Sequence, residues 1–484
     1  MKPTGFFLAA PSTVQVDESF RVGVKVLGEP YVVDTACSRH IPQVVGRYNR
    51  SPRGIAYMDN VLPEWKGRIE IKGSSGYEGP CSLSFEGITG PYEDDHRPIT
   101  RIEDVRFREP GIKYITVNDP ETGKTATTNP IVVSDEPPHE RLFWGDLHSQ
   151  TFFSDGLRCP EELYAFAREE AFLDIFALSD HAERLTDRQW EYFTAVTNDF
   201  NVPGSFVTLV GLEWTSSRFG HRNVYYPEAQ GPILRSDDPV YGELEKVYEV
   251  ALERGALVIP HHSANAVMGV DWSLGHKPEV ERLVEIHSIW GNSERPASDG
   301  NPLPILFAGG EKDGQHVVDA LRRGYRFGFI GGGDIHDGRP GDELHALQKQ
   351  PADYCHLRRQ GIMGVWAKAL TREAIFEALW SRRVFATTNV RIILRFSVCD
   401  APMGSEIHHR GPRFIKVFAA SEVPFTSLEL VRNGADVVRI QPHQREVSWE
   451  IEDAGTEGAD WYYVRLVRED GQLAWSSPVW VDTL

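Results

Sequence analysis

The sequence is poor in cysteine and has no closely spaced cysteine pair. Five cysteines are spread along 484 residues without any CxxC spacing: Cys37, Cys81, Cys159, Cys355 and Cys399. A disulfide framework or a cysteine zinc site needs thiols near enough to pair or to share an ion. We therefore expect reduced thiols and a cytoplasmic protein.

Long apolar runs and excess positive charge are also lacking. No stretch approaches the roughly 20 apolar residues of a membrane helix, and the apolar run at residues 5–10 is too short for the core of a secretory signal. We therefore expect no membrane partner. The net charge of −19 disfavours nucleic acid as a partner, because phosphate backbones are bound by basic faces. A small phosphorylated substrate remains compatible, since bound metal ions can reverse the local field.

Two catalytic motifs are absent as well. The sequence contains neither the phosphate-binding loop GxxxxGK[ST] nor the nucleophile elbow GxSxG. Their absence disfavours a nucleoside triphosphatase of the phosphate-loop type and a serine hydrolase.

What is present divides the chain into three parts, as its length suggests. Residues 1–140 alternate apolar and polar residues, which predicts a β-sandwich-like domain with strands at 20–27, 68–72, 113–117 and 131–133. Residues 391–484 predict a second β domain of the same kind. Its strand candidates lie at 391–397, 414–419, 427–431, 461–467 and 478–482. We expect these flanks to brace the middle, although they could also be binding modules.

The middle, residues 141–390, alternates short apolar runs with amphipathic helices. The helices are predicted at 160–172, 241–254 and 316–323, and they are followed by strands at 174–178, 256–259 and 327–330. This β-then-α rhythm is typical of parallel strands joined by crossover helices. The predicted class is therefore α/β.

Six polar clusters in the middle each follow an apolar run. They begin near Asp146-Leu147-His148, Ser179-Asp180-His181, Leu212-Glu213, Pro260-His261-His262, Glu285-Ile286-His287 and Asp334-Ile335-His336. In parallel α/β folds the carboxyl ends of strands meet at one edge, where sites form. Converging carboxylates and imidazoles would be costly to bury unless divalent cations accepted their lone pairs. Imidazole and carboxylate without thiolate suit zinc, manganese or iron. The sequence therefore predicts a site for divalent transition metals.

The order DLHxxTxxSDG, SDH, GLE, PHH and GDIH resembles the PHP (polymerase and histidinol phosphatase) superfamily. More narrowly, the chain resembles the branch called domain of unknown function 3604, through residues 144–148, 220–225, 260–262, 383–388 and 474–481. This resemblance implies a distorted (β/α)7 barrel in the middle of the chain. It also implies a hydrolase that holds up to three metal ions.

The resemblance also implies a set of ligands. One metal would be held by His148, Glu213 and Asp334. Glu213 would bridge to a second metal held by His261 and His287, and a third would be held by His181 and His336. The superfamily's usual HxH is here His148-Ser149-Gln150. Because an amide is a weaker ligand than imidazole, Gln150 could ligate weakly, orient a water or leave the first metal loosely held. We therefore expect two or three metals.

Supporting roles are predicted for the residues around these ligands. Asp146, Asp155 and Asp180 would orient ligands or cap turns. The segment His221-Arg222-Asn223 lies just beyond the strand with Glu213, so it would contact substrate or metal, or else form a polar loop that bonds to itself.

The ligand set predicts hydrolysis by metal-activated water. Arg222 would stabilise negative charge in the transition state, and His262 would donate a proton to the leaving group. On the resemblance we favour a phosphoesterase acting on a small organic phosphate. Two alternatives stay open: a metal-dependent amide, lactone or ester hydrolase, and a non-catalytic metal-containing binding protein. The sequence leaves the oligomeric state open.

Overall fold

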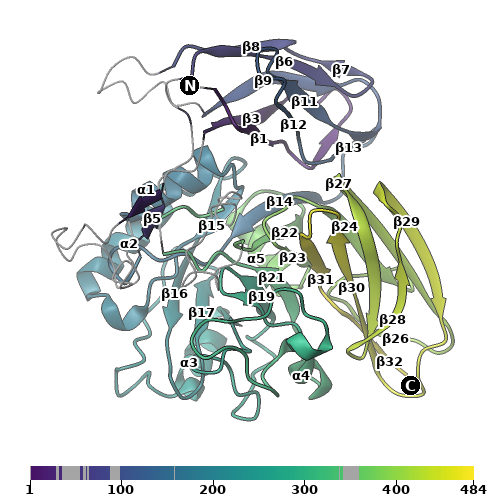
Figure 1. Ribbon diagram of the computed structural model, residues 1–484. Coiled ribbons are helices and arrows are strands. Elements are labelled where there is room, and N and C mark those ends of the chain that lie inside the picture. Colours follow the sequence, from purple (N-terminus) through teal and green to yellow (C-terminus); the bar gives the residue numbers. More distant parts are fainter. Residues whose placement is uncertain are drawn as a thin grey trace.

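The computed structural model describes residues 2–28, 32–34, 55–57, 62, 65–87, 99–156, 158–336, 338–341 and 359–483. Cys37, Cys355 and Asp337 lie outside these residues. Over the described part, the chain is a mixed α/β structure with far more strand than helix (Figure 1). Cys81, Cys159 and Cys399 are free thiols. None of the helices in this part is both long and apolar enough to cross a bilayer.

The N-terminal part forms sheets that share one core. The first two sheets contain β1 (Gly5–Ala9), β3 (Phe20–Leu27), β9 (Ile99–Phe107) and β7 (Tyr77–Glu78), and β10 (Gly111–Lys113), β13 (Ile131–Ser134) and β2 (Thr13–Gln15). A third contains β12 (Thr125–Thr127), β11 (Ile115–Asn118), β6 (Gly67–Gly73) and β8 (Ser82–Phe85), and β4 (Val32–Asp34) pairs with β5 (Ile55–Tyr57). Val22 and Val24 of β3 pack in one buried cluster with Ile69 and Ile71 of β6, as alternating strands of two facing sheets do.

The predicted N-terminal strands are confirmed, with one change. The strand at 20–27 is β3, and those at 68–72 and 131–133 are within β6 and β13. The strand predicted at 113–117 is divided at Tyr114 into β10 and β11, which belong to different sheets. Tyr114 leaves the ladder and its backbone N–H donates instead to the Ser74 hydroxyl.

The middle of the chain contributes the first half of a long sheet. Its order is β18 (Leu257–Pro260), β17 (Arg222–Tyr226), β16 (Val207–Trp214), β15 (Ile175–Ala177), β14 (Arg141–Asp146), β22 (Ile362–Ala367) and β23 (Val384–Thr387). The strands β14, β15 and β16 are parallel, whereas β17, β18, β22 and β23 join antiparallel. A separate sheet pairs β19 (Leu283–Ser288) with the parallel β21 (Gly328–Gly331) and the short β20 (Gly291–Asn292).

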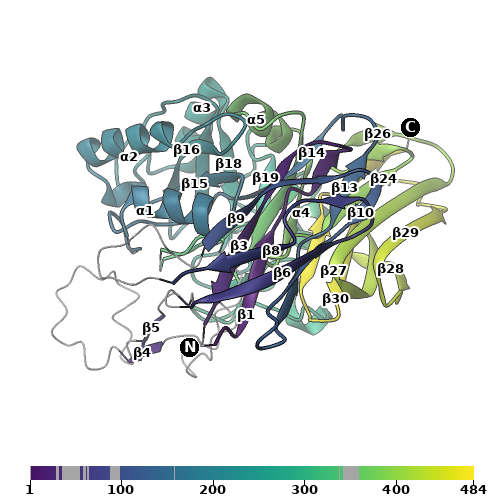
Figure 2. The same ribbon diagram turned by 90° about the horizontal axis from the view of Figure 1, so that it is seen from above.

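Helices cover these two sheets from outside (Figures 1 and 2). They are α1 (Pro160–Ala165), α2 (Asp187–Asp199), α3 (Leu244–Arg254), α4 (Val317–Arg322) and α5 (Arg372–Trp380). The helix predicted at 160–172 starts as expected but changes at Phe166 into one π-helical turn. The predictions at 241–254 and 316–323 correspond to α3 and α4. With mixed strand directions in the described part, a (β/α)7 barrel is not evident.

The C-terminal strands continue the same sheet past β23. They are β31 (Leu473–Ser476), β30 (Asp460–Arg468), β27 (Arg413–Arg432), β24 (Ile393–Val398) and β25 (Ala401–Pro402), with β26 (Glu406–His408), β28 (Ala435–Ile440), β29 (Gln444–Asp453) and β32 (Val479–Asp482) beside them. One buried apolar cluster runs through both regions, from Trp144 to Tyr462. The C-terminal strands therefore support the middle of the chain through shared core and shared hydrogen bonds.

The N-terminal sheets lie across both other parts, as Figure 2 shows. At β14, the indole N–H of Trp144 donates to the Ser12 hydroxyl at 2.9 Å. Arg141 donates two 2.8 Å hydrogen bonds to the carboxylate of Glu18, a bidentate geometry that fixes orientation. These contacts fix the start of β14, the strand that leads to His148.

Candidate metal centre

The residues of the candidate site meet at one edge of the central sheet. Because β14, β15 and β16 are parallel, their carboxyl ends lie at that edge, and the segments with His148, His181 and Glu213 follow from it. Backbone bridges join Ser149 to Ile335 and His181 to Glu213. The turn that follows β21 and carries Asp334 and His336 therefore joins the same edge.

Glu213 is the centre of the cluster. Its side chain is almost fully buried, and five polar side chains surround its two carboxylate oxygens. The distances are 2.7 Å to Nδ1 of His221, 2.9 Å to Nε2 of Gln150, 3.2 Å to Nε2 of His261, 3.5 Å to Nδ1 of His181 and 3.5 Å to Nε2 of His148. A carboxylate shared in this way has the position that a bridging ligand requires.

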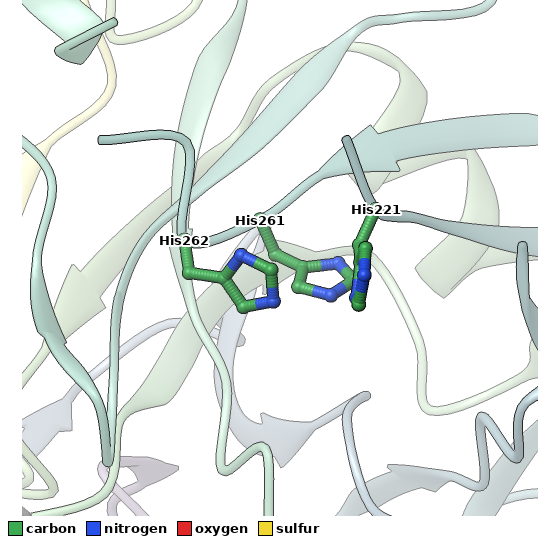
Figure 3. Close-up of side chains that lie close together, drawn as sticks. All are labelled: His221, His261 and His262. Atoms are coloured by element: carbon green, nitrogen blue, oxygen red, sulfur yellow. The ribbon is translucent and has the colours of Figure 1, made fainter. Parts of the chain in front are cut away.

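Three histidines form one metal-capable group beside Glu213. One ring nitrogen from each of His221, His261 and His262 lies within 4.8 Å of the others. Figure 3 shows the three rings in a row, with His221 beside His261. His221 precedes β17, and His261 and His262 follow β18. Because β17 is antiparallel to both β16 and β18, its first residue lies at the edge where those two strands end. The hairpin thus brings His221, predicted as a substrate contact, into ligand distance.

A second group surrounds His148. Its Nε2 lies 3.5 Å from Asp334, and its Nδ1 lies 3.0 Å from Oε2 of Glu285. A carboxylate on one ring nitrogen sets the orientation of the other, as for many metal-binding histidines. Glu285 and Asp334 together with His148 form one metal-capable group, and His148 with Glu213 and His261 forms another.

His287 is not in any of the metal-capable groups among the described residues. Its Nε2 lies 2.8 Å from the carbonyl oxygen of Arg359, and its ring stacks near Trp475. The pairing of β19 with β21 shifts register between Glu285 and His287. Glu285 is therefore the residue of this strand that reaches the cluster, which differs from the ligand implied by the sequence resemblance.

The third group lies nearest to solvent. Asp155 is 3.4 Å from Nε2 of His181 and 3.6 Å from Nε2 of His336. The side chain of His336 is 11% exposed, whereas that of His148 is fully buried. Arg184 follows on the same loop with its side chain 32% exposed, and its Nη1 lies 3.2 Å from Asp155. Asp155, predicted only as a support, is thus in direct contact with both predicted histidine ligands.

The charges in the cluster strongly perturb its pKa values. Burial alone would lower the pKa of His148, but Asp334 and Glu285 raise it well above the ordinary value. Burial acts in the same direction on His181, whose pKa Glu213 and Asp155 raise to about 10. Burial would raise the pKa of Glu213, yet His181 and His261 hold it well below its usual range. The carboxylates therefore stabilise positive charge beside them, whether it is carried by protonated histidines or by metal ions.

His262 differs from these histidines. Burial, followed by the charges of His261 and His221, lowers its pKa well below the ordinary value. Its Nδ1 has no hydrogen-bond partner among the described residues. A neutral imidazole offers a lone pair, so this geometry suits a metal ligand. It does not suit the proton donor predicted from the sequence.

Several buried nitrogen and oxygen atoms of the cluster make no hydrogen bond, although ionisable side chains lie near some of them. Within the described residues they include Nε2 of His148, both ring nitrogens of His261, Nδ1 of His262, Oε1 of Gln150 and Oδ1 of Asp155. Buried polar atoms are normally satisfied, so a convergent set of exceptions indicates a missing partner. Imidazole and carboxylate donors with these spacings fit divalent transition metals such as zinc, manganese or iron.

Gln150 is part of the cluster. Its Nε2 donates to Glu213 at 2.9 Å and its buried Oε1 has no partner among the described residues. The amide oxygen is thus available as a weak ligand. Because a carboxylate accepts hydrogen bonds, the amide nitrogen faces Glu213 and the amide oxygen is left for a metal.

Arg222 and Asn223 have different surroundings. Arg222 is buried, pairs with Glu281 at 2.8 Å and donates to the carbonyl oxygen of Phe219. This does not support the predicted contact of Arg222 with substrate. Asn223 is the cross-strand partner of Glu213, which places both side chains on one face of the sheet. Alternation along β17 explains why neighbouring residues face opposite sides.

Asp146 and Asp180 brace the loops that carry the ligands. Oδ1 of Asp146 accepts hydrogen bonds from the backbone N–H groups of His148 and Gly333. Asp180 accepts bonds from the backbone and hydroxyl groups of Thr151 and Ser154. Burial raises the pKa of Asp146 to about 7 and that of Asp180 to about 6. These contacts match supporting roles.

Backbone conformation is also specialised here. A Cβ on Gly332 would lie 2.0 Å from the Glu285 carboxylate and 3.0 Å from Cβ of His148, so the close packing of Glu285 against His148 needs glycine. Asp334 and His262 have φ values of 52° and 33°. Such left-handed conformations in non-glycine residues are uncommon and cluster at functional sites.

Sequence reasoning missed three residues of the site. Glu285 lies in the predicted cluster Glu285-Ile286-His287, but the resemblance implies His287 as its ligand. Arg184 and Thr215 carried no motif, although Thr215 lies 2.5 Å from Nδ1 of His181. Position in the sequence could have found two of them: Arg184 lies three residues after the Asp180-His181 pair, and Thr215 directly follows the strand with Glu213.

Comparison with known proteins gives a family and several relatives. Residues 158–295 and 342–406 match a family described as a protein of unknown function, DUF3604. An uncharacterised protein of Chlamydia pneumoniae is 29% identical over 399 residues, and one of Chlamydia muridarum is 30% identical over 404 residues. Both alignments cover 78% of this chain and 63% of the relative. The chain thus spans less than two thirds of the length of these relatives.

Solved structures offer more distant likenesses. A two-domain protein of Bacteroides vulgatus that contains a predicted PHP-like metal-dependent phosphoesterase is 15% identical, with a TM-score of 0.37, over 71% of this chain and 97% of that one. Fibronectin(III)-like modules of CbhA from Clostridium thermocellum are 20% identical, with a TM-score of 0.13, over 18% of this chain and 94% of that one. At these TM-scores neither likeness carries an argument about this chain.

Proposed function

We propose that this chain is a metal-dependent phosphoesterase that acts on a small organic phosphate. The observation that carries the proposal is the set of metal-capable groups at and beside Glu213, in which several buried nitrogen and oxygen atoms make no hydrogen bond within the described residues. One position would be held by His148, Glu213 and His261, with Gln150 beside it. His221 and Glu213 would hold a second, and Asp155, His181 and His336 a third. His287 is not retained as a ligand.

The distorted (β/α)7 barrel belongs to the same proposal. It is supported by β18 lying beside β19 and β21 lying beside β22 and β23, so that the two sheets of the middle follow one another around a common centre. The division into residues 1–140, 141–390 and 391–484, the cytoplasmic location and a small-molecule partner are likewise proposals.

Each side chain has a distinct part in the proposed reaction. Divalent metals supply such a site with Lewis acidity and make water a better nucleophile near neutral pH. Arg184, held by Asp155 at the exposed side of the cluster, binds and orients the anionic group of the substrate. Neutral His262 would offer the lone pair of Nδ1 to a metal ion. Glu285 holds the ring of His148 in place, and the buried walls of the cluster exclude bulk water.

The preference for phosphate depends on the partly exposed guanidinium of Arg184 beside the cluster. Arg184 is a partly exposed guanidinium beside the most exposed metal-capable group. Guanidinium groups match the geometry of phosphate oxygens and bind them through two hydrogen bonds. A neutral amide or lactone would make no use of this charge.

The test is an activity panel on protein loaded with manganese, zinc or iron. We expect metal-dependent release of phosphate from small phosphomonoesters, and no comparable turnover of carboxyl esters, lactones or amides. Glu213→Gln is the matched control and should lose activity by more than about 100-fold, beyond the effect of residues that only support ligands. Turnover of carboxyl esters alone would favour the other hydrolase, and metal binding without any turnover would favour a binding protein.

A further inference from the structure

An aromatic pair lies directly beside the metal-capable group that is nearest to solvent. The indole of Trp290 meets the imidazole of His336 in an edge-on arrangement, with 5.9 Å between the ring centroids. The ring of Phe307 stacks on the indole, with 4.4 Å between centroids. His336 shares its metal-capable group with Asp155 and His181. Aromatic carbon therefore adjoins a group that is otherwise made of charged and polar side chains.

This aromatic pair is separate from the large apolar cores of the described residues. Trp290 forms a small buried cluster with Ile289 and Ile335, and Phe307 packs against that cluster. Trp290 is buried, whereas Phe307 keeps part of its surface exposed and the neighbouring Leu306 is exposed. Ligand sites are commonly lined by aromatic side chains of this kind, supported on one side and open on the other, with a few polar groups beside them.

The loop that carries Phe307 is fastened to two segments of the metal-capable cluster. The side-chain amide of Asn265, three residues after His262, donates to the carbonyl oxygen of Phe307 at 2.8 Å. The backbone N–H of Ile289 donates to the carbonyl oxygen of Gly333, in the turn that follows β21. The aromatic pair is therefore held between the loop after His262 and the turn that carries His336, so its position relative to the cluster is fixed.

A further aromatic side chain lies on the turn that carries Asp155. Only two phenylalanines of the described residues have exposed side chains, and Phe152 is one of them. The turn is held in place because Asp180 accepts hydrogen bonds from the backbone N–H and the hydroxyl of Ser154. The metal-capable group nearest to solvent thus has apolar carbon next to two of its ligands, His336 and Asp155, and the guanidinium of Arg184 next to Asp155.

We propose that the substrate is an aryl phosphate, whose ring packs against Phe307 and Trp290 while its phosphate lies beside Arg184. This inference rests on the proposed phosphoesterase function and names its substrate class. Aromatic rings pack favourably in stacked and edge-to-face arrangements, whereas the hydroxyl groups of a glycerol phosphate would find no hydrogen-bond partner on aromatic carbon. Hydrolysis forms a bond from the water oxygen to phosphorus and breaks the bond from phosphorus to the aryl oxygen. That oxygen takes a proton from the water and leaves as the phenol.

Calorimetric titration of the full chain, loaded with manganese or zinc, tests the inference with two probes that are not phosphate esters, phenylphosphonate and methylphosphonate. The wild type should bind phenylphosphonate at least about tenfold more tightly, as the burial of part of one ring predicts. Phe307→Ala should lose most of this preference because phenylphosphonate alone binds more weakly. An equal weakening of both probes would show that Phe307 only supports the site, and would overturn the inference.

Phe414→Ala is the matched control. It removes the other exposed phenylalanine of the described residues, which lies on β27, and it should bind both probes like the wild type. Phe307→Leu keeps an apolar side chain without the flat ring and should show a smaller preference than the wild type. It decides the result if thermal unfolding shows that Phe307→Ala does not fold. Equal affinities of the wild type for the two probes, or an unchanged preference in the Phe307 variants, would also overturn the inference.

Failure of this inference can be told apart from failure of the proposed function. Hydrolysis of phenyl phosphate and methyl phosphate is measured on the same preparations. Turnover of both phosphates together with equal affinities for the two phosphonates would overturn the aryl preference and leave the phosphoesterase in place. Turnover of neither phosphate would overturn the proposed function and the aryl phosphate with it, whereas the phosphonate affinities would still report on the aromatic contact.

Discussion

Nδ1 of His221 lies 2.7 Å from Oε1 of Glu213, on either side of the loop that joins β16 to β17. This contact changes the ligand set that the sequence suggests. His221 belongs to the metal-capable groups and His287 does not, although both are histidines near strand ends.

The exchange predicts opposite results for two similar variants. His221→Ala should remove a ligand of the Glu213 cluster. Metal affinity should then fall by at least about tenfold. His287→Ala should keep metal occupancy, since His287 contacts the Arg359 carbonyl instead. Metal titration into chelator-treated protein measures both. Loss of metal in His287→Ala together with wild-type affinity in His221→Ala would reverse the assignment.

Gln150 should tune the metal held next to Glu213. Gln150→His supplies imidazole where a neutral amide now lies, so metal affinity should rise about tenfold. Gln150→Ala removes both the hydrogen bond to Glu213 and the unpartnered Oε1, and should lower occupancy and turnover. Binding curves for the wild type and both variants decide the role. Three superimposable curves with unchanged kinetics would make Gln150 a bystander.

Arg184 should act on substrate binding. Arg184→Met keeps an apolar stem but removes the charge next to Asp155, so KM for a phosphomonoester should rise by about ten- to 100-fold, the range of about 1.4 to 2.7 kcal/mol. Arg184→Lys should recover part of this loss, because the charge returns without the fork geometry. Steady-state kinetics at constant metal occupancy provide the measurement. An unchanged KM in Arg184→Met would remove this residue from the proposed mechanism.

Asp174 should make stability depend on pH. Burial raises its pKa to about 6, although the backbone N–H of Trp144 and the charge of Arg391 lower it. In the unfolded chain the carboxyl has its ordinary pKa of about 4. Between about pH 4 and pH 6 the folded chain therefore keeps a proton that the unfolded chain has lost. The free energy of unfolding decreases as pH rises through this range. Asp174 is half-buried, so we expect a loss of about 1–2 kcal/mol after allowance for solvent.

Asp174→Asn is the matched comparison. It keeps an acceptor for Trp144 and cannot ionise, so it should be more stable than the wild type at pH 7 and equal to it near pH 4. Chemical denaturation of both proteins across this window measures the difference. A difference that stays constant from pH 4 to pH 7 would contradict the assignment.

Local patterns predicted the elements better than their connections. The alternation at residues 20–27 gives β3 with the same bounds, because each inward residue packs in one core. By contrast, the two strands predicted at 414–419 and 427–431 are one strand, β27. Pro424 suggests a break, yet the register shifts between Ala420 and Ser427 absorb it. A sequence shows where a strand can end. It does not show whether pairing with neighbouring strands lets the strand continue past that point.

The same limit applies to the site. Strand-end positions predicted His148, Glu213 and His261 as neighbours, because parallel strands end at one edge. Two features of the site could not be predicted from local sequence patterns. The antiparallel β17 returns His221 to that edge, and the register shift in β19 selects Glu285 over His287. Both depend on pairing between strands that are distant in the sequence.

The central claim is that the cluster around Glu213 holds metal ions, and elemental analysis of the purified chain tests it most directly. The wild type, reconstituted with manganese, zinc or iron and then freed of loosely bound ions, should contain two or three metals per chain. Glu213→Gln, prepared in the same way, should contain at least one fewer, because the shared carboxylate is lost. Fewer than one metal per wild-type chain, or equal content in both proteins, would contradict the account.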